Sequence, residues 1–419
     1  MEKRVIGVNE RLPFLKCLPL SIQHVFAMFG ATVLVPTLFN IDPGIVLFMN
    51  GLGTLLFLII TKGKSPAYLG SSFAFLAIGQ SVIATYGYQT ACGAFIVTGL
   101  VGCLIALCIK FFGTKWIDVV LPPAAMGPIV ALIGLELASS VASTAGIISV
   151  DGAPILTQNV VVFIITLVVA VLGGVVFKGF FKLIPILIAI IAGFISAVGF
   201  GMIDFSALSS APLIQVPNFQ APVFNINAIL MMLPVVLVTT TEHIGHQVVT
   251  SKIIGKDLLK DPGLDRSLFA DNFSTAISGA IGSVPTTTYG ENIGVMAMTK
   301  VYSVQVIAIA AVISILMGFL GQVSAFIQLI PQPVIGGISF ILYGMIGASG
   351  IRILIDNKVN YDDSVNLTLT SVVFITGLSG VSVSLGNITL SGMVLACVVG
   401  MILGIIFYVL KKLKLTNDE

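Results

Sequence analysis

Residues 285–300, PTTTYGENIGVMAMTK, do not read as one regular membrane helix. The stretch starts with Pro, runs through Thr, Tyr and Gly, and becomes apolar only in its second half. Residues 66–84, PAYLGSSFAFLAIGQSVIA, follow the same plan. Non-helical backbone at membrane depth is tolerated only where it is buried in protein or lines a cavity. We therefore predict that each stretch crosses the membrane half extended and half helical.

The composition places these stretches in a membrane protein. Of 419 residues, 57% are hydrophobic and only 9% are charged, whereas soluble domains carry about 25% charged residues. The formal net charge of +2 is too small to indicate a nucleic-acid partner. The five cysteines are scattered and form no CxxC pair, so they suggest neither disulfides nor a thiolate metal site. We predict one all-α polytopic membrane domain.

Fourteen segments are predicted to cross the bilayer, each apolar helix needing roughly 20 residues. They begin near residues 17, 44, 66, 91, 117, 158, 183, 226, 268, 285, 303, 325, 365 and 391. With the N-terminus in the cytoplasm, all 20 Lys and Arg residues fall on the cytoplasmic side, as the positive-inside rule requires. This alternation predicts a multi-pass protein of the cell membrane with both termini cytoplasmic.

The two halves of the chain resemble each other. Residues 121–139, LPPAAMGPIVALIGLELAS, align without gaps on residues 330–348, IPQPVIGGISFILYGMIGA. IQHVF at 22–26 resembles TEHIG at 241–245, and AYLG at 67–70 resembles TYG at 288–290. Seven segments in each repeat is an odd number, so the second repeat enters the membrane from the opposite side. We predict a seven-plus-seven inverted repeat, in which paired interrupted segments mark a transporter's binding site.

Three acidic residues, Glu136, Glu242 and Glu291, are predicted to lie well inside the spans. An ionisable residue there is a functional-site hypothesis, because insertion scales assign it a cost of about 2.5–3.5 kcal/mol. Glu242 and His246 are four residues apart and share a helix face, whereas His243 points about 100° away. A carboxyl group in a low dielectric beside an imidazole can take up and release a proton near neutral pH. For Glu136 we expect a packing or interface role.

The cluster EHIGH at 242–246 has two other interpretations. A zinc site needs three or four ligands, and this spacing is not HExxH in a chain with three histidines. An intramembrane metal-dependent hydrolase is therefore the weaker hypothesis, and we expect no metal and no cofactor. A hydrogen-bonded structural pair stays open as the second interpretation.

The breaks in the two interrupted segments offer groups for a ligand. Glu291 follows Gly290 at one break, and Phe73 occupies the corresponding place at the other. Unpaired N–H groups at the start of a helix can donate to carbonyl oxygens of a ligand. Two carboxyl groups, backbone donors and an aromatic ring suit a planar heterocycle with N–H and C=O edges. A large anion is disfavoured because no Arg or Lys is nearby.

Several motifs are similar to those of a known family. ENIGVMAMTK at 291–300 resembles the signature of the nucleobase–ascorbate transporter family, and QH at 23–24 resembles its first-span motif. SIQHVFAMFGATVLVP, KGKSPAYLGSSFAF, LPPAAMG, KDLLKDPGLDRS and TTYGENIGVMAMT are similar to its bacterial uracil-transporting subgroup. The resemblance covers nearly the whole chain and implies proton-coupled uracil import by alternating access, without enzymatic activity.

The resemblance also assigns roles to individual residues. It implies that Glu242 and Glu291 bind N–H groups of the base, and that backbone at Phe73 and Gly290 binds its oxygens. His246 would hydrogen-bond Glu242 and help to couple the proton.

Four further positions follow from the same resemblance. Tyr289 and Tyr343 would lie near the site, and His24 and Asn292 would support the motif. Family members that transport xanthine or urate commonly carry Gln at the position of Glu291, which favours a pyrimidine. Another nucleobase, such as xanthine or urate, stays the alternative substrate.

The resemblance implies two domains, each built from parts of both repeats. Residues 1–115 and 223–323 would form a core domain, and residues 116–222 and 324–419 a gate domain. The implied partners are uracil, protons, the lipid bilayer and a second copy of the chain.

Overall fold

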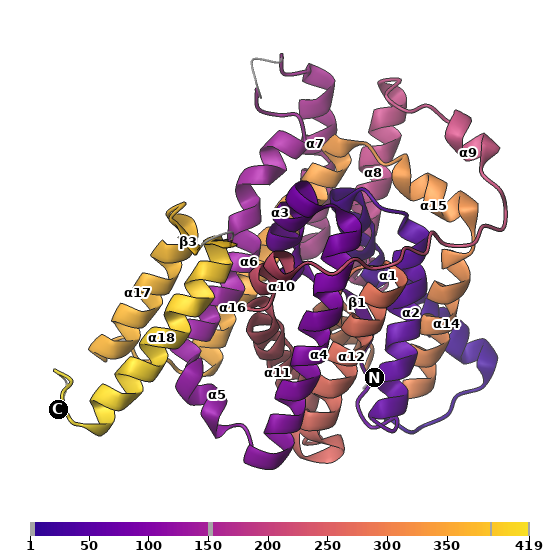
Figure 1. Ribbon diagram of the computed structural model, residues 1–419. Helices are drawn as coiled ribbons and strands as arrows, with labels where there is room; N and C mark the ends of the chain where they lie inside the picture. Colours follow the sequence, from indigo (N-terminus) through magenta and orange to yellow (C-terminus); the bar gives the residue numbers. More distant parts are fainter. Residues whose placement is uncertain (1–4, 150–153, 386–387, 418–419) are drawn as a thin grey trace.

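The computed structural model describes residues 5–149, 154–385 and 388–417. Helices dominate these residues, and long apolar ones lie beside one another (Figure 1). Eight of the described helices are long and apolar enough to cross a membrane. A pair bent by 81°, α14 (Val304–Gly318) and α15 (Gly321–Gln328), forms a ninth candidate. The predicted all-α polytopic membrane fold is confirmed.

Each predicted segment overlaps helices or strands of the structure, and some of them, such as those predicted to begin near residues 66, 117, 226 and 325, overlap more than one element. The first half contains α1 (Phe14–Phe39), α2 (Pro43–Ile60), β1 (Leu69–Ser71), η1 (Phe73–Phe75), α3 (Leu76–Tyr86), α4 (Tyr88–Phe112), α5 (Lys115–Val120), α6 (Pro123–Thr144), α7 (Thr157–Val176), η2 (Phe181–Leu183), α8 (Pro185–Gly199) and α9 (Ser206–Ser210). The second half contains α10 (Ile226–Met232), α11 (Val235–Ile254), η3 (Leu259–Gly263), α12 (Leu264–Ile281), β2 (Thr286–Thr288), α13 (Gly290–Thr299), α14, α15, α16 (Gln332–Asp356), α17 (Ser364–Leu378), β3 (Ser382–Leu385), β4 (Ile388–Ser391) and α18 (Gly392–Lys412). The antiparallel pairing of β3 with β4 was not predicted.

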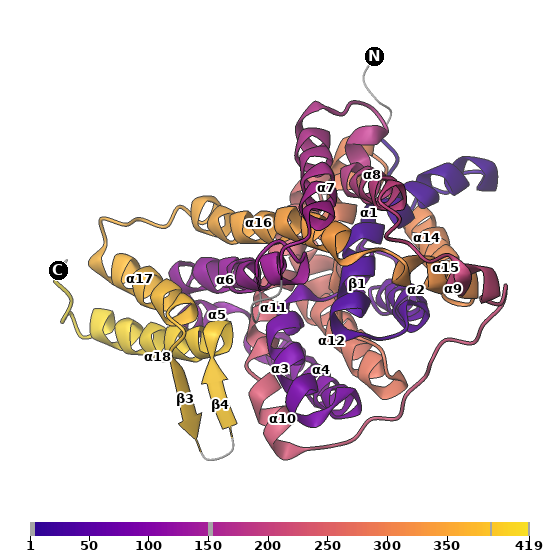
Figure 2. The ribbon, with the colours of Figure 1, turned by 90° about the horizontal axis from the view of Figure 1, so that it is seen from above.

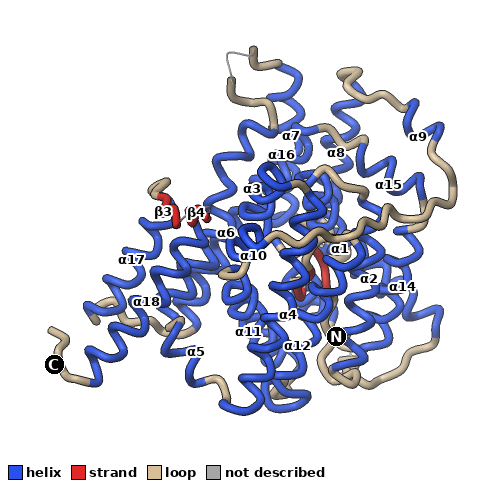
Figure 3. Tube along the Cα trace, viewed as in Figure 1, coloured by secondary structure: helices blue, strands red, loops and turns tan. Residues whose placement is uncertain are grey.

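The extended halves of the two interrupted segments pair with each other. β1 and β2 are antiparallel, with Leu69 opposite Thr288 and Ser71 opposite Thr286. Figure 3 shows these two short strands in red among the surrounding helices. Because lipid offers no hydrogen bonds, each strand supplies the backbone partners that the other needs. The prediction of half-extended, half-helical segments is therefore confirmed.

Threonine side chains complete the hydrogen bonding of the strands. Thr54 of α2 accepts a hydrogen bond from the Leu69 N–H at 2.9 Å. Thr275 of α12 donates to the Thr286 carbonyl at 2.8 Å and accepts from the Thr286 N–H at 3.2 Å. These bonds fix the strand pair to helices from both halves of the chain.

Helices α6 and α16 pack against each other through small residues. Gly127 lies against the Gly350 carbonyl and Gly134 against the Tyr343 carbonyl, so the two helices run antiparallel. Small residues allow this close approach of helix backbones. An antiparallel contact between the two segments that align in sequence is the geometry expected of an inverted repeat.

Glu136 fixes the start of α18. Its Oε2 accepts a hydrogen bond from the Met393 N–H at 3.0 Å. The first N–H groups of a helix have no partner within the helix, and an acidic group near them is favourable. This contact between α6 and α18 agrees with the packing role expected for Glu136.

The helices fall into two groups on either side of α11. Helices α5, α6, α17 and α18 and the β3–β4 hairpin lie together at the left of Figures 1 and 2. Helices α1, α2 and α14 lie on the right, with α12 and the paired strands between them and α11. This arrangement leaves α11 and the strand pair facing α6 and α16.

The α6–α16 contact predicts a contrast between two glycines of α16. A Cβ at Gly350 would meet backbone atoms of Ala131 and Gly127, which cannot move aside, whereas a Cβ at Gly344 would meet nothing within 4 Å. Gly350→Ala should destabilise the protein by about 1–3 kcal/mol through overpacking. Gly344→Ala should leave stability unchanged or slightly raised, because Ala favours helix. Thermal unfolding of the purified variants measures the difference, and equal melting temperatures would contradict the packing described.

Candidate functional site

A cavity of about 610 Å³ lies between the strand pair and the α6–α16 pair. One wall consists of α11, β2 and the first residues of α13, together with Phe73. The opposite wall consists of residues from α5, α6 and α16. Binding sites for small molecules have volumes of about 300–1,000 Å³, so this cavity is large enough for a heterocyclic base.

One face of α11 lines the cavity. Glu242, Gly245, His246, Val249 and Lys252 all contribute to the wall, as residues three and four apart on one helix face should. Glu242 and His246 therefore share the face predicted from their spacing. His243 does not line the cavity and is fully buried on another side of α11.

His246 bonds to a strand rather than to Glu242. Its Nδ1 lies 2.9 Å from the Thr288 Oγ1 in β2, and the two atoms share a hydrogen bond. Glu242 Oε2 is buried and has no hydrogen-bond partner among the described residues. The predicted Glu242–His246 hydrogen bond is therefore wrong for this structure, because β2 passes beside α11 at the level of the imidazole. The unpartnered carboxylate oxygen favours binding of a ligand donor or a proton.

Two helices begin at the cavity from opposite halves of the chain. Gly290 is the first residue of α13 and is exposed in the cavity wall, and Glu291 follows it. Phe73 is the first residue of η1, which leads into α3. The first N–H groups of each helix lack intrahelical partners, and the positive ends of both helix dipoles lie at the cavity. The structure thus brings together the four residues predicted to bind the base.

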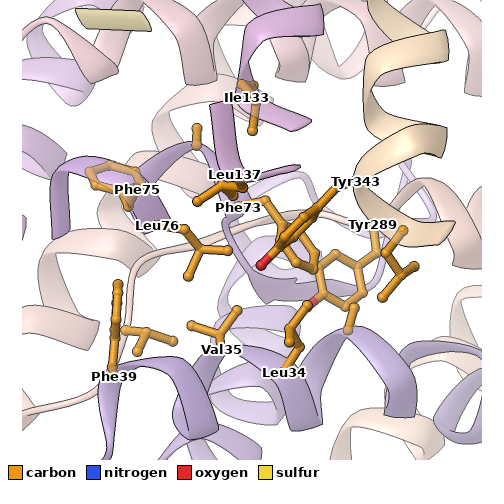
Figure 4. Packing of buried hydrophobic residues seen from close by; sticks show 14 of the residues in the cluster. Leu34, Val35, Phe39, Phe73, Phe75, Leu76, Ile133, Leu137, Tyr289 and Tyr343 are labelled. Carbon is orange, nitrogen blue, oxygen red and sulfur yellow. The ribbon is translucent and has the colours of Figure 1, made fainter. Parts of the chain in front are cut away.

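The two predicted tyrosines lie beside Phe73 but differ in their exposure to the cavity. Tyr343 does not line it, and its ring contacts the Phe73 ring edge to face, with centroids 6.5 Å apart at 80°. Tyr289 lines the cavity, and its ring lies against Gly70. Figure 4 shows the three rings close together. Tyr343 therefore reaches from α16 to the Phe73 ring without lining the cavity.

His24 and Asn292 lie outside the cavity and contact each other. The Asn292 Nδ2 is 3.1 Å from the His24 Nδ1 and donates to the His24 carbonyl at 3.1 Å. Both side chains are buried. This contact ties α1 to α13 at the residue directly after Glu291, which is a supporting position as the motif suggested.

Asp271 is a buried acid that sequence reasoning missed. It lies about two turns into α12, and its Oδ2 is 3.7 Å from the Nδ1 of His243. The two side chains are 2% and 0% exposed. The prediction of three intramembrane acids was therefore incomplete. The predicted start of this span near residue 268 had placed Asp271 at the membrane edge, although the apolar stretch LFA precedes it.

The far end of the cavity is charged. Among the described lining residues the basic ones are Lys252 and Arg352, and the acidic ones at this end are Asp118 and Asp356. Arg352 Nε lies 3.5 Å from Asp356 Oδ2. Lys252 is ten residues beyond Glu242, which corresponds to roughly 15 Å along a helix. The cavity thus runs from a pair of carboxyl groups to a mouth with both signs of charge.

The fold and the site define a polytopic membrane transporter rather than an enzyme. A family model described as "Permease family" matches residues 15–386. The chain belongs to this permease family, which confirms the resemblance to nucleobase–ascorbate transporters found in its motifs.

Curated relatives match over essentially their whole length. The chain is 51% identical to "Uracil permease" of Paenibacillus larvae subsp. larvae, covering 100% of both chains. It is 52% identical to "Uracil permease" of Escherichia coli strain K12, covering 99% of this chain and 96% of that protein. Identity to "Uracil permease" of Bacillus subtilis is 43%, with 97% and 96% covered.

Solved structures of other transporters share the fold. The transmembrane domain of the cyanobacterial bicarbonate transporter BicA matches with a TM-score of 0.63 at 15% identity, covering 95% of this chain and 100% of that one. The murine Solute Carrier 26 family member A9 anion transporter matches with a TM-score of 0.74 at 9% identity, covering 95% and 69%. At such low identity the likeness concerns the fold alone.

The hydrogen bond between His246 and Thr288 predicts a contrast between neighbouring threonines. Thr288→Val should destabilise the protein by about 0.5–1.5 kcal/mol, because it removes the hydrogen bond of a part-buried imidazole nitrogen. Thr287→Val is the matched control, since Thr287 is buried in the same strand and its Oγ1 has no partner among the described residues. Thermal unfolding should show a lower melting temperature for the first variant only. Equal effects would contradict the assigned bond.

Proposed function

We propose that the protein is a symporter that imports uracil together with protons. The observation that carries this proposal is the meeting of Glu242 and Glu291 with the helix starts at Phe73 and Gly290 in one cavity. The names of relatives with 51–52% identity over nearly the whole chain support uracil as the substrate.

Uracil has two N–H groups and two carbonyl oxygens around a planar ring. In the proposed complex, the carboxyl oxygens of Glu242 and Glu291 accept hydrogen bonds from the N–H groups. The backbone N–H groups at Phe73 and Gly290 donate to the carbonyl oxygens, and the Phe73 ring packs against the base. The unpartnered Glu242 Oε2 supports this arrangement, because a ligand donor would satisfy it.

Glu242 is proposed as the group that couples proton movement to binding. Burying an ionised carboxyl group without a charged partner is costly, and protonation removes much of this cost. Protonation from outside would lower the free-energy cost of burying Glu242 when the base binds. Release of the proton inside would weaken the binding of the base again. His246, one helix turn along the same face of α11, would assist this exchange.

We propose that the core domain, residues 1–115 and 223–323, moves against the gate domain, residues 116–222 and 324–419. This movement would give alternating access. The position of the cavity supports this division, because one wall comes from α11, β2, α13 and Phe73 and the other from α5, α6 and α16. Binding groups lie on the core side, so a relative movement would expose them to opposite faces of the membrane in turn.

The membrane setting is part of the same proposal. Exposed apolar residues such as Val168, Leu172 and Val175 follow one face of α7, and we propose that this face contacts lipid. Both termini would be cytoplasmic, as the distribution of basic residues predicts.

A homodimer is also proposed from the family resemblance. Light scattering of the purified protein tests it, and a monomeric mass would contradict it.

Replacing the coupling carboxyl should abolish accumulation of the base. An inward gradient of one pH unit stores about 1.4 kcal/mol per proton, enough for about tenfold accumulation of uracil in proteoliposomes. In Glu242→Gln, uptake of labelled uracil should reach no more than equal concentrations on the two sides. Glu136→Gln is the control, because Glu136 is an intramembrane acid outside the cavity and Gln keeps an acceptor oxygen for the Met393 N–H. Full accumulation in Glu242→Gln would contradict the coupling role.

Replacing the second carboxyl group, that of Glu291, should weaken the binding of uracil. Glu291→Gln exchanges an acceptor for an amide with its own donors, and loss of a hydrogen bond to a charged group costs about 1.5–3 kcal/mol. Uracil affinity should therefore fall about 10- to 100-fold. Competition of labelled uracil by a panel of nucleobases measures this change, with the wild-type protein as reference. Stronger competition by xanthine or urate than by uracil in the wild-type protein would favour the alternative substrate.

A further inference from the structure

The segment before α1 is hydrogen-bonded to the residues that follow α13. Residues 5–12, called the arm, run beside residues 300–305, which are the connection from α13 and the first two residues of α14. The arm and this connection form a parallel bridge at Ile6 and Val301. The Ile6 N–H donates to the Lys300 carbonyl and the Tyr302 N–H donates to the Ile6 carbonyl, both at 2.9 Å.

Further hydrogen bonds extend this attachment to the start of α14. The Val304 N–H donates to the Val8 carbonyl at 3.0 Å, and the Ser303 Oγ donates to the Glu10 carbonyl at 2.7 Å. Gln305 bonds to both backbone groups of Leu12, accepting at 2.9 Å and donating at 3.2 Å. The arm is therefore held along its length rather than at a single contact.

The arm also packs behind the cavity wall. Val8 is 4% exposed and belongs to a buried cluster with Ile293 and Met296 of α13, against which Val249 of α11 packs. Ile293 and Val249 also line the cavity. The same apolar side chains therefore contact the substrate cavity and the cluster that contains Val8.

Helix α13 needs such support because it is short. It has ten residues, whereas isolated helices shorter than about 12–15 residues are marginal. Its first turn is placed by the strand pair and by the Asn292–His24 contact. Its last residues are placed by the arm, through the Lys300 carbonyl and the Val8 cluster.

We infer that the arm is a positioning element of the binding site, which holds α13 so that Gly290 and Glu291 face the ligand. This inference rests on the proposed function in so far as the ligand is uracil. None of residues 5–12 lines the cavity. Its effect reaches the site through the end of α13 and through Ile293.

Two variants of the arm separate this role from general stability. Val8→Asp places a charge in the apolar cluster and should detach the arm from α13. Val5→Asp is the matched control, because Val5 is 56% exposed on the same arm. Ser303→Ala is a milder variant, which removes only the hydrogen bond to the Glu10 carbonyl and keeps the test usable if Val8→Asp does not fold.

Two readouts are needed, both taken well below the melting temperature. Hydrogen exchange of the amides of residues 290–299 should be at least tenfold faster in Val8→Asp than in Val5→Asp. The dissociation constant of uracil for the folded fraction should rise about tenfold in Val8→Asp and about threefold in Ser303→Ala, with no change in Val5→Asp.

A purely structural arm would lower the melting temperature while leaving both the exchange of α13 and the dissociation constant unchanged, and this result would overturn the inference. If the wild-type protein binds no uracil, the proposed function fails, and the exchange of α13 still decides the role of the arm. Faster exchange then supports the inference, and unchanged exchange contradicts it.

Discussion

Backbone hydrogen bonding inside the membrane is the constraint that organises this protein. Two segments, one from each half of the chain, stop being helical at membrane depth, where lipid offers no donor or acceptor. The structure satisfies them by pairing β1 with β2 and by adding the hydroxyl groups of Thr54 and Thr275. Because the strands must pair, the helices that follow them begin close together, and this places Phe73 and Gly290 at one cavity.

Some side chains of the site are held by other groups of the protein, whereas others are left free to bind a ligand. His246, Asn292 and Tyr343 have partners within the protein, namely Thr288, His24 and the Phe73 ring. Glu242 Oε2 has none among the described residues. A site with preorganised surroundings and a few unsatisfied polar groups binds with less loss of conformational entropy than one that must be ordered on binding. The α6–α16 contact contributes by holding Tyr343 against the Phe73 ring.

Local features of the sequence were enough to predict the interrupted segments and the shared face of Glu242 and His246, because Pro, Gly and helical periodicity act within a few residues. The partner of His246 was predicted wrongly, since it depends on where β2 passes α11. Asp271 was missed because a span start near residue 268 puts it at the membrane edge, whereas α12 begins at Leu264 and buries it. Tyr343 was expected near the site through the family resemblance, and only the structure shows that it packs against the Phe73 ring without lining the cavity.

A structure of the protein with uracil bound would test whether the strand pair builds the binding site. We expect the base in the cavity, with its N–H groups within about 3 Å of carboxyl oxygens of Glu242 and Glu291 and its carbonyl oxygens at similar distances from the N–H groups at Phe73 and Gly290. Density for the base in contact with neither Glu242 nor Glu291, or outside the space between the strand pair and α6–α16, would contradict it.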